Sequence, residues 1–275
     1  MRNSMAVRVI SSVVGALIFI AVFLGGLLPL KIGAAVISII GMFELYRAVS
    51  GKLKPVHFVG FAAEIWYVFM RENCDMMLNG FMVLAAVIVL LILLIAQHEQ
   101  TDIHDVSITV FGFLYVGMLM YNLVDLYKIA PYLIWLPLIC AWGSDTFAYF
   151  VGVKFGKHKL APVLSPKKSI EGSVGGVIGA GVLTVVYFLV CDRLGFIPEE
   201  NGAPPVTVIG FAIGAVSAAF SQVGDIAAST IKRQMNVKDY GNIMPGHGGI
   251  LDRFDSVLFT APMIYILLNL VSNGH

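Results

Sequence analysis

The stretch 78–96 constrains the fold more than any other part of the sequence, because every residue from position 81 to 96 is apolar. A helix of about 20 apolar residues crosses the hydrocarbon core of a bilayer. Similar stretches recur along the chain, in which 58% of the residues are hydrophobic and only 13% are charged. An ordinary soluble domain carries about 25% charged residues. The sequence therefore predicts an all-α integral membrane protein.

Hydropathy divides the chain into about nine transmembrane helices. The predicted spans are 7–29, 32–49, 57–70, 78–96, 107–126, 130–151, 170–190, 204–228 and 256–272. The count depends most on the third span, which is short and contains Glu64. The first span follows Arg2 and Arg8 as a signal peptide would. It has no convincing small-residue cleavage site and leads into further spans, so we interpret it as a retained anchor.

The basic residues give this arrangement an orientation. With a cytoplasmic N-terminus, 14 of the 18 Lys and Arg residues fall in cytoplasmic segments. That bias is the one expected for membrane proteins. The polar site is then predicted at the cytoplasmic side, and the short termini favour a bacterial inner (plasma) membrane.

Composition and cysteine spacing exclude several other classes of protein. Disorder needs low hydrophobicity and high net charge, and this chain has neither. Nucleic acid is not an expected partner, because 18 basic residues against 17 acidic residues leave a net charge of +1. Cys74, Cys140 and Cys191 lie far apart, which argues against a disulfide framework or a thiolate metal site.

Charged residues are concentrated in 141–173 and 221–256, which hold 15 of the 35 in the chain. In the second stretch, four polar residues recur at helical spacing and form one stripe. They are Ser221, Asp225, Ser229 and Lys232. Lipid cannot satisfy such a stripe, so it must face protein or a water-filled cavity. The two stretches are therefore predicted to meet at one membrane face.

The stripe is followed by a glycine-rich turn at 245–249 and by Asp252 and Asp255, one helical turn apart. Glycines at this density allow the backbone to form a phosphate-binding nest. Carboxylates beside basic residues are suited to Mg²⁺ and phosphate together. The basic residues are Lys232, Arg233 and Lys238. The alternative is a purely structural ion pair between Asp225 and Lys232 or Arg233.

The first stretch carries Asp145 late in an apolar span, with Tyr149 on the same face. A basic loop follows, in which Lys167 and Lys168 lie in a turn directly before a glycine-rich helix. Such a turn can place phosphate at a helix N-terminus, or the loop can contact anionic lipid. In the helix, small residues four apart at 172–179 favour packing within the chain, with a dimer seam as the alternative.

The pattern from Ser229 to Asp255 resembles the motif of the phosphatidate cytidylyltransferase family. The matching residues read S-T-I-K-R, four residues, K-D, and then P-G-H-G-G-I-L-D-R-F-D. Met244 stands where the family pattern has Leu, Ile or Phe, which is a conservative departure. Upstream, the 144–149 and 165–172 stretches also look like the family's, so the resemblance covers residues 141–256.

The resemblance implies a multi-span, homodimeric enzyme that converts CTP and phosphatidate to CDP-diacylglycerol and pyrophosphate with Mg²⁺, and it leaves open a K⁺ beside it. By the same resemblance Asp225 and Asp252 are the metal ligands. We further expect Lys232, Arg233 and Lys238 to act with them in catalysis. The residues expected at the substrates are Ser144, Asp145, Lys167, Lys168, Ser229, Asp239, His247, Gly248, Gly249, Arg253 and Asp255. Residues 1–140 are then scaffold helices with possible dimer contacts, and 141–275 form the catalytic region.

Two other functions fit a membrane protein with buried carboxylates. A secondary transporter usually shows paired halves with broken helices, and no such halves are visible in the sequence. A CDP-alcohol phosphotransferase would carry a D-x-x-D-G-x-x-A-R pattern on a helix. The stretch 224–228 supplies only one aspartate, so that motif is missing.

Overall fold

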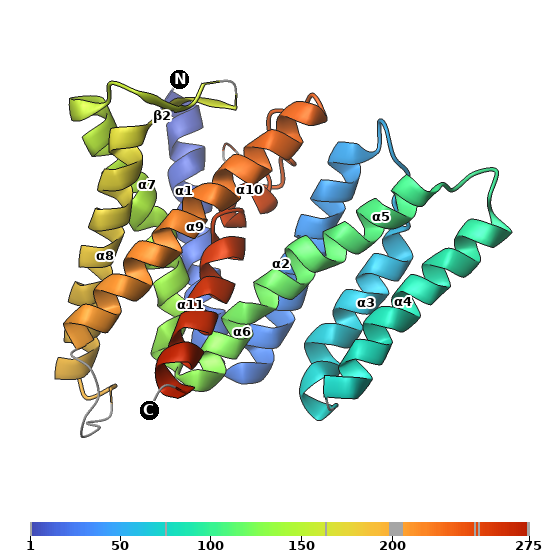
Figure 1. Cartoon of the computed structure of the whole chain (residues 1–275), viewed down its shortest axis with the longest axis horizontal. Coiled ribbons are helices and arrows are strands. Elements are labelled where there is room, and N and C mark those ends of the chain that lie inside the picture. The colour runs from blue at the N-terminus through green and yellow to red at the C-terminus, as the bar shows by residue number, and fades with distance from the viewer. Residues whose placement is uncertain are drawn as a thin grey trace. The chain divides into compact units, whose positions relative to one another are not determined.

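The computed structural model describes residues 2–74, 76–162, 164–197, 206–244, 246 and 248–273. Helices dominate this part of the chain, together with one short hairpin of two strands (Figure 1). The helices are α1 (Arg2–Leu24), α2 (Leu27–Val49), α3 (His57–Met70), η1 (Arg71–Asn73), α4 (Met76–Ala96), α5 (Ile103–Gly112), η2 (Phe113–Met118), α6 (Leu119–Ile129), η3 (Pro131–Ile134), α7 (Trp135–Phe155), α8 (Ile170–Arg193), α9 (Val206–Gln234), α10 (Leu251–Phe254) and α11 (Val257–Asn273). The strands are β1 (Lys159–Ala161) and β2 (Ser165–Ser169).

The predicted all-α membrane class is confirmed. Within the described residues, seven helical stretches are long and apolar enough to cross a bilayer. They are Leu27–Val49, Met77–Ala96, Ile103–Ile129, Pro131–Phe155, Ile170–Arg193, Thr207–Gln234 and Leu251–Ser272. Helix α3 has 14 residues, and Val13–Leu24 of α1 is an apolar helical stretch of fewer than 18 residues, so neither is counted among these seven. A count of nine spans therefore stays a prediction.

The first predicted boundary is wrong by several residues. The predicted spans 7–29 and 32–49 are replaced by α1 ending at Leu24 and α2 beginning at Leu27. Gly26 causes the break, because its φ of 90° lies in the left-handed region that glycine tolerates. Pro29 does not delay α2, since proline is accepted in the first turn of a helix.

The chain forms two compact units. One comprises Met1–Val124 and Lys232–Phe254, and the other comprises Asp125–Ile231 and Asp255–His275. Helix α9 contributes to both, since the division falls between Ile231 and Lys232. The expected functional division into 1–140 and 141–275 is a separate matter and stays a prediction.

In the first unit, α2 packs against α3, α5 and the π-helix η2. Tyr46 lies at the centre of this packing with no exposed surface, and its hydroxyl donates a 2.8 Å hydrogen bond to the Thr109 carbonyl. Gly60 and Gly112 border the Tyr46 ring so closely that an added Cβ would overlap it. Glycine at these two positions lets the helix backbones approach one another.

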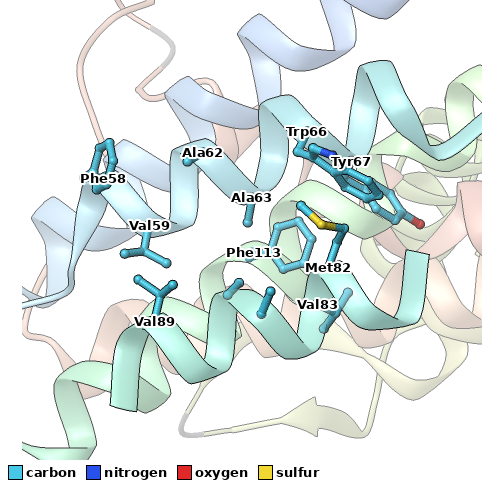
Figure 2. A pocket seen from close by; sticks show the side chains of 12 residues that line it. Phe58, Val59, Ala62, Ala63, Trp66, Tyr67, Met82, Val83, Val89 and Phe113 are labelled. Atoms are coloured by element: carbon cyan, nitrogen blue, oxygen red, sulfur yellow. The ribbon is translucent and has the colours of Figure 1, made fainter. Parts of the chain in front are cut away.

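An apolar cavity of about 350 Å³ lies between α3 and α4 in the same unit (Figure 2). Alanines 62 and 63 and Val59 line it from α3, Val83 lines it from α4, and Phe113 also borders it. Helix α4 is almost entirely unburied, with 6% of its apolar window inside the protein. The cavity is therefore suited to hydrocarbon and offers nothing to a phosphate group.

In the second unit, α7 and α8 run side by side, with β2 at the start of α8 (Figure 1). A Cβ at Gly172 or Gly176 would lie 2.7 Å from a backbone carbonyl of α7, and one at Gly175 or Gly179 would overlap a side chain of α7. The prediction that these small residues serve packing within the chain is confirmed. The turn predicted around Lys167 and Lys168 is wrong, because those residues lie in β2, which pairs antiparallel with β1.

Candidate active site

Three charged residues from separate elements come together in the second unit. Asp145 lies on α7, Asp225 on α9 and Lys168 on β2. The Lys168 ammonium forms an ion pair with the Asp225 carboxylate. Asp145 interacts electrostatically with both of them. Both side chains are partly exposed, at 24% for Lys168 and 28% for Asp225, while the Lys168 Nζ atom itself is buried.

The alternative prediction, that Asp225 forms a structural ion pair with Lys232 or Arg233, is wrong because Asp225 pairs with a different lysine. Lys232 is seven residues from Asp225 on the same helix. A helix rises about 1.5 Å per residue, which separates their backbones by roughly 10 Å. The partner of Asp225 comes instead from the hairpin, and Lys232 pairs with Asp252.

A cavity of about 490 Å³ opens beside this group in the second unit. Its lining includes Asp145, Tyr149, Lys167 and Lys168. The prediction that Asp145 and Tyr149 share a face is therefore confirmed. Two lysines on the wall of a cavity this size can hold the phosphate end of a ligand, because cations neutralise phosphate charge.

One wall of the cavity is fixed by a network around Gln222 on α9. Its amide nitrogen donates to Ser144 Oγ at 3.1 Å and to the Ser173 carbonyl at 3.0 Å, and Ser173 Oγ donates to the amide oxygen of Gln222. Ser144 has no exposed surface. Ser144 therefore touches the site through Gln222. Gln222 was not among the residues predicted from the sequence, although it lies in the polar stretch 221–256.

The hairpin that carries Lys168 is anchored at the start of α8. Ser169 Oγ accepts the Gly172 amide at 3.1 Å and forms the N-cap of the helix. The Glu171 carboxylate accepts the amides of Lys157 and His158 and also pairs with the His158 ring. These contacts hold β1 and β2 against the helix, so the lysine side chains are presented from a fixed backbone.

The first unit holds a second polar group, centred on Asp252 of α10. One Asp252 oxygen pairs with the Lys232 ammonium at 2.7 Å. The other accepts the amides of Tyr240 at 2.8 Å and Gly249 at 3.0 Å. The Asp252 side chain is 3% exposed and that of Lys232 is 13% exposed. A carboxylate buried this deeply is stable only because a cation and two amides satisfy it.

The glycine-rich turn closes on itself next to Asp252. Gly246 and Gly248 have φ values of 77° and 86°, and the Met244 amide donates to the Gly248 carbonyl at 3.0 Å. The positive φ values bear out the sharp turn expected from the glycines. The amide of Gly249 is already donated to Asp252. His247, expected at the substrates, lies outside the described residues.

Glu44 of α2 completes this group and was not among the residues predicted from the sequence. One of its oxygens accepts the Ile250 amide at 3.1 Å and the other accepts the Leu251 amide at 2.8 Å. Its side chain is 2% exposed. The available signal was a single carboxylate within the predicted span 32–49, because an ionisable residue inside a membrane span is a functional candidate by default.

The other predicted site residues differ in exposure. Arg233, Lys238, Asp239 and Arg253 are exposed, whereas Ser229 is half-buried. Asp255 is buried and accepts the Ser256 amide at 2.7 Å, next to the start of α11. Asp225 and Asp252, the predicted metal ligands, belong to different compact units. Each has its own lysine partner.

Fold and site together define an α-helical integral membrane protein with clusters of carboxylates and lysines, a set suited to phosphate chemistry. The chain belongs to the cytidylyltransferase family, whose model matches residues 6–271. It is similar to the phosphatidate cytidylyltransferase of Bacillus subtilis (strain 168), at 32% identity over 96% of this chain and 98% of that protein. The enzymes of the same name from Staphylococcus saprophyticus and Staphylococcus haemolyticus are 31% and 32% identical, each over 96% of this chain and 99% of the relative.

Proposed function

We propose that the chain transfers the cytidylyl group of CTP to phosphatidate, giving CDP-diacylglycerol and pyrophosphate. The observation that carries this proposal is the match over 96% of the chain to relatives that bear this activity in their name. The site supports it, because aspartates and lysines gather in an otherwise apolar protein. Phosphatidate keeps its acyl chains in the bilayer, which suits an enzyme that is itself embedded there.

The reaction makes modest demands on the protein. A phosphate oxygen of phosphatidate attacks the α-phosphorus of CTP, and the bond to the pyrophosphate group breaks. The second pKa of a phosphate monoester is near 6, so the nucleophile is mostly dianionic at neutral pH. Because pyrophosphate is a good leaving group, no strong general acid or base is needed. Catalysis is then mainly positioning and charge neutralisation, and His247 is assigned a structural or phosphate-bonding role.

The basic side chains of the two units are assigned to different phosphate groups. Lys167 and Lys168 line the cavity of the second unit, where they would neutralise phosphate oxygens. Lys232 is held beside Asp252, and the exposed Arg233 and Lys238 follow it along the chain. We assign these three to the charge that develops on the triphosphate or the lipid phosphate during transfer.

Mg²⁺ fits the donor set that the chain offers. Within the described part of the chain, no three His, Cys, Asp or Glu side chains group together as metal ligands. Mg²⁺ needs no such group, because it is usually held by one or two carboxylates with water and substrate phosphates. Asp225, with Asp145 beside it, and Asp252 are each proposed as a magnesium ligand, with K⁺ left open as a second ion. A bound Mg²⁺ would neutralise phosphate charge and bring the two substrates together.

The other residues expected at the substrates keep that role as a proposal. Asp239 and Arg253 are exposed and open to a ligand, whereas Ser144 and Gly249 are buried and would act through their neighbours. The half-buried Ser229, the turn residue Gly248 and the buried Asp255 complete the set. We also propose a homodimer in a bacterial inner membrane with a cytoplasmic N-terminus, as the resemblance and the basic residues indicate.

Purified protein in detergent, given phosphatidate, Mg²⁺ and labelled CTP, tests the function directly. We expect labelled CDP-diacylglycerol, with pyrophosphate released only when both substrates are present. Asp225→Asn should abolish most of this activity, whereas Asp192→Asn, an exposed aspartate in the last turn of α8, should not. A wild-type protein that makes no labelled lipid refutes the proposed reaction. Near-normal activity of Asp225→Asn refutes the metal assignment.

A further inference from the structure

Glu44 is a buried carboxylate far from the site motif in sequence. It lies in the last two turns of α2, and the two residues whose amides it accepts are 206 and 207 positions further along the chain. Neither the motif nor the polar stretch 221–256 includes it. A carboxylate inside a predominantly apolar helix is costly to bury, so it must be compensated by its partners.

Both oxygens of Glu44 are used by the backbone that leads into α10. One oxygen accepts the Ile250 amide and the other accepts the Leu251 amide. A Cβ at Gly241 or Gly249 would overlap the Glu44 carboxyl group, so the turn encloses it from two sides. Glycine at those two positions is what allows the carboxylate to reach the amides.

The three successive amides before Asp252 therefore all donate to carboxylates. The Gly249 amide donates to Asp252 itself, and the next two donate to Glu44. Hydrogen bonds to a charged acceptor are stronger than those between neutral groups. Glu44 thus fixes the two residues that immediately precede Asp252, and with them the direction of the Asp252 side chain towards Lys232.

We propose that Glu44 is a positioning residue for the cytidylyl transfer, acting through the backbone at Ile250 and Leu251 to hold Asp252 in its working orientation. The inference rests on the proposed function. Both Glu44 oxygens accept amides of the turn that leads into α10, and the Mg²⁺ dependence of a Glu44→Gln variant distinguishes this role from metal binding. Glutamine cannot replace it. One of the two acceptor oxygens would become an NH₂ group, which is a donor and cannot accept the Ile250 or Leu251 amide.

Glu44→Gln is the first test, with Asp105→Asn as the matched control. Asp105 is also buried in the first unit, and its carboxylate also accepts two backbone amides, those of Lys54 and Asp102, but at a different helix end. We expect kcat of Glu44→Gln to fall by roughly 10- to 100-fold, the cost of slightly misplacing a reacting group. The KM values for CTP and phosphatidate should stay within about threefold, and Glu44→Asp, which keeps both oxygens, should recover part of the loss.

Hydrogen exchange measured by mass spectrometry gives a readout that does not depend on activity. In Glu44→Gln the amides of Ile250 and Leu251 should exchange at least about tenfold faster, since each has lost a charged acceptor. In Asp105→Asn they should not change. If Glu44→Gln does not fold, Gly241→Ala replaces it, because the added methyl group pushes the Glu44 carboxyl group from the turn.

The outcomes separate the two proposals. A wild-type enzyme without CTP-dependent lipid product refutes the function, while exchange at Ile250 and Leu251 still tests the anchoring by Glu44. An active wild type whose Glu44→Gln variant loses no more kcat than Asp105→Asn refutes the positioning role. A Glu44→Gln variant that only needs more Mg²⁺, with unchanged kcat and exchange, also refutes it and makes Glu44 a metal ligand.

Discussion

Removing one partner of the pair between Lys232 and Asp252 should destabilise the protein more than removing both. The two groups are 2.7 Å apart, and their side chains are 13% and 3% exposed. Asp252→Asn leaves the Lys232 ammonium without its charged partner. It also replaces one of the two carboxylate oxygens, which between them bind Lys232 and the amides of Tyr240 and Gly249, by an NH₂ group that cannot accept a hydrogen bond. Losing one member of a buried ion pair costs about 3–5 kcal/mol, so we expect the free energy of unfolding to fall by about that amount.

The double variant Lys232→Met/Asp252→Asn removes the stranded charge as well. It should recover about 2 kcal/mol relative to Asp252→Asn, since the interaction energy between groups in direct contact is about 0.5–3 kcal/mol. Thermal or chemical denaturation in detergent, followed for both single variants and the double variant, measures that coupling. Activity should be lost in all three, because both side chains are proposed to act at the substrates.

Lys128→Met is the matched control for this cycle. Lys128 lies 3.5 Å from Asp125, and its side chain is 30% exposed. Because the Lys128–Asp125 pair is longer and Lys128 is more exposed than Lys232, the variant should cost less than Asp252→Asn, although the Asp125 side chain is only 8% exposed. Strict additivity of the Lys232 and Asp252 substitutions would refute the reasoning, and so would an Asp252→Asn variant no less stable than Lys128→Met.

Three further substitutions test other parts of the structure. Lys168→Met should raise the KM for CTP or phosphatidate more than about tenfold, because a phosphate contact of about 1.4 kcal/mol or more is lost; unchanged KM values in steady-state kinetics would remove Lys168 from substrate binding. Gly176→Val should destabilise the contact between α7 and α8 by about 1–3 kcal/mol, whereas Gly80→Ala, with open space around it, should not; equal melting temperatures would contradict this. Ala86→Leu should change the free energy of unfolding by less than about 1 kcal/mol, because it extends into the apolar cavity of Figure 2; a loss of several kcal/mol would mean that the cavity is closed to it.

The long helices were predictable from the sequence because each contains a long apolar run. Helix α3 begins and ends at the residues predicted for the third span, although it contains the buried Glu64. Boundaries failed where a single backbone conformation decides them, as at Gly26. The hairpin of β1 and β2 was missed for a related reason. Strands of three and five residues leave too short a pattern to distinguish from a loop.

The partners of the site residues were harder to predict than the residues themselves. Polar residues in an apolar chain marked Asp145, Asp225 and Asp252 as candidates, because burying a charge needs a reason. Local spacing suggested that Asp225 pairs along its own helix, but Lys168 reaches it from 57 positions away. Pairings between distant segments depend on how helices pack, and a single sequence does not contain that information.

The glycine-rich turn shows how one pattern supports two physical interpretations. Glycines next to an aspartate predict a nest of amides for phosphate, yet the amides of residues 249–251 donate to Asp252 and Glu44. The glycines at 241 and 249 admit the Glu44 carboxyl group, which any Cβ there would exclude. Under the proposed function, phosphate recognition would then rest mainly on the basic side chains, and the turn holds a carboxylate at a fixed place. A motif whose glycines suggest direct substrate binding is thus one whose amides, at residues 249–251, bind the protein's own carboxylates.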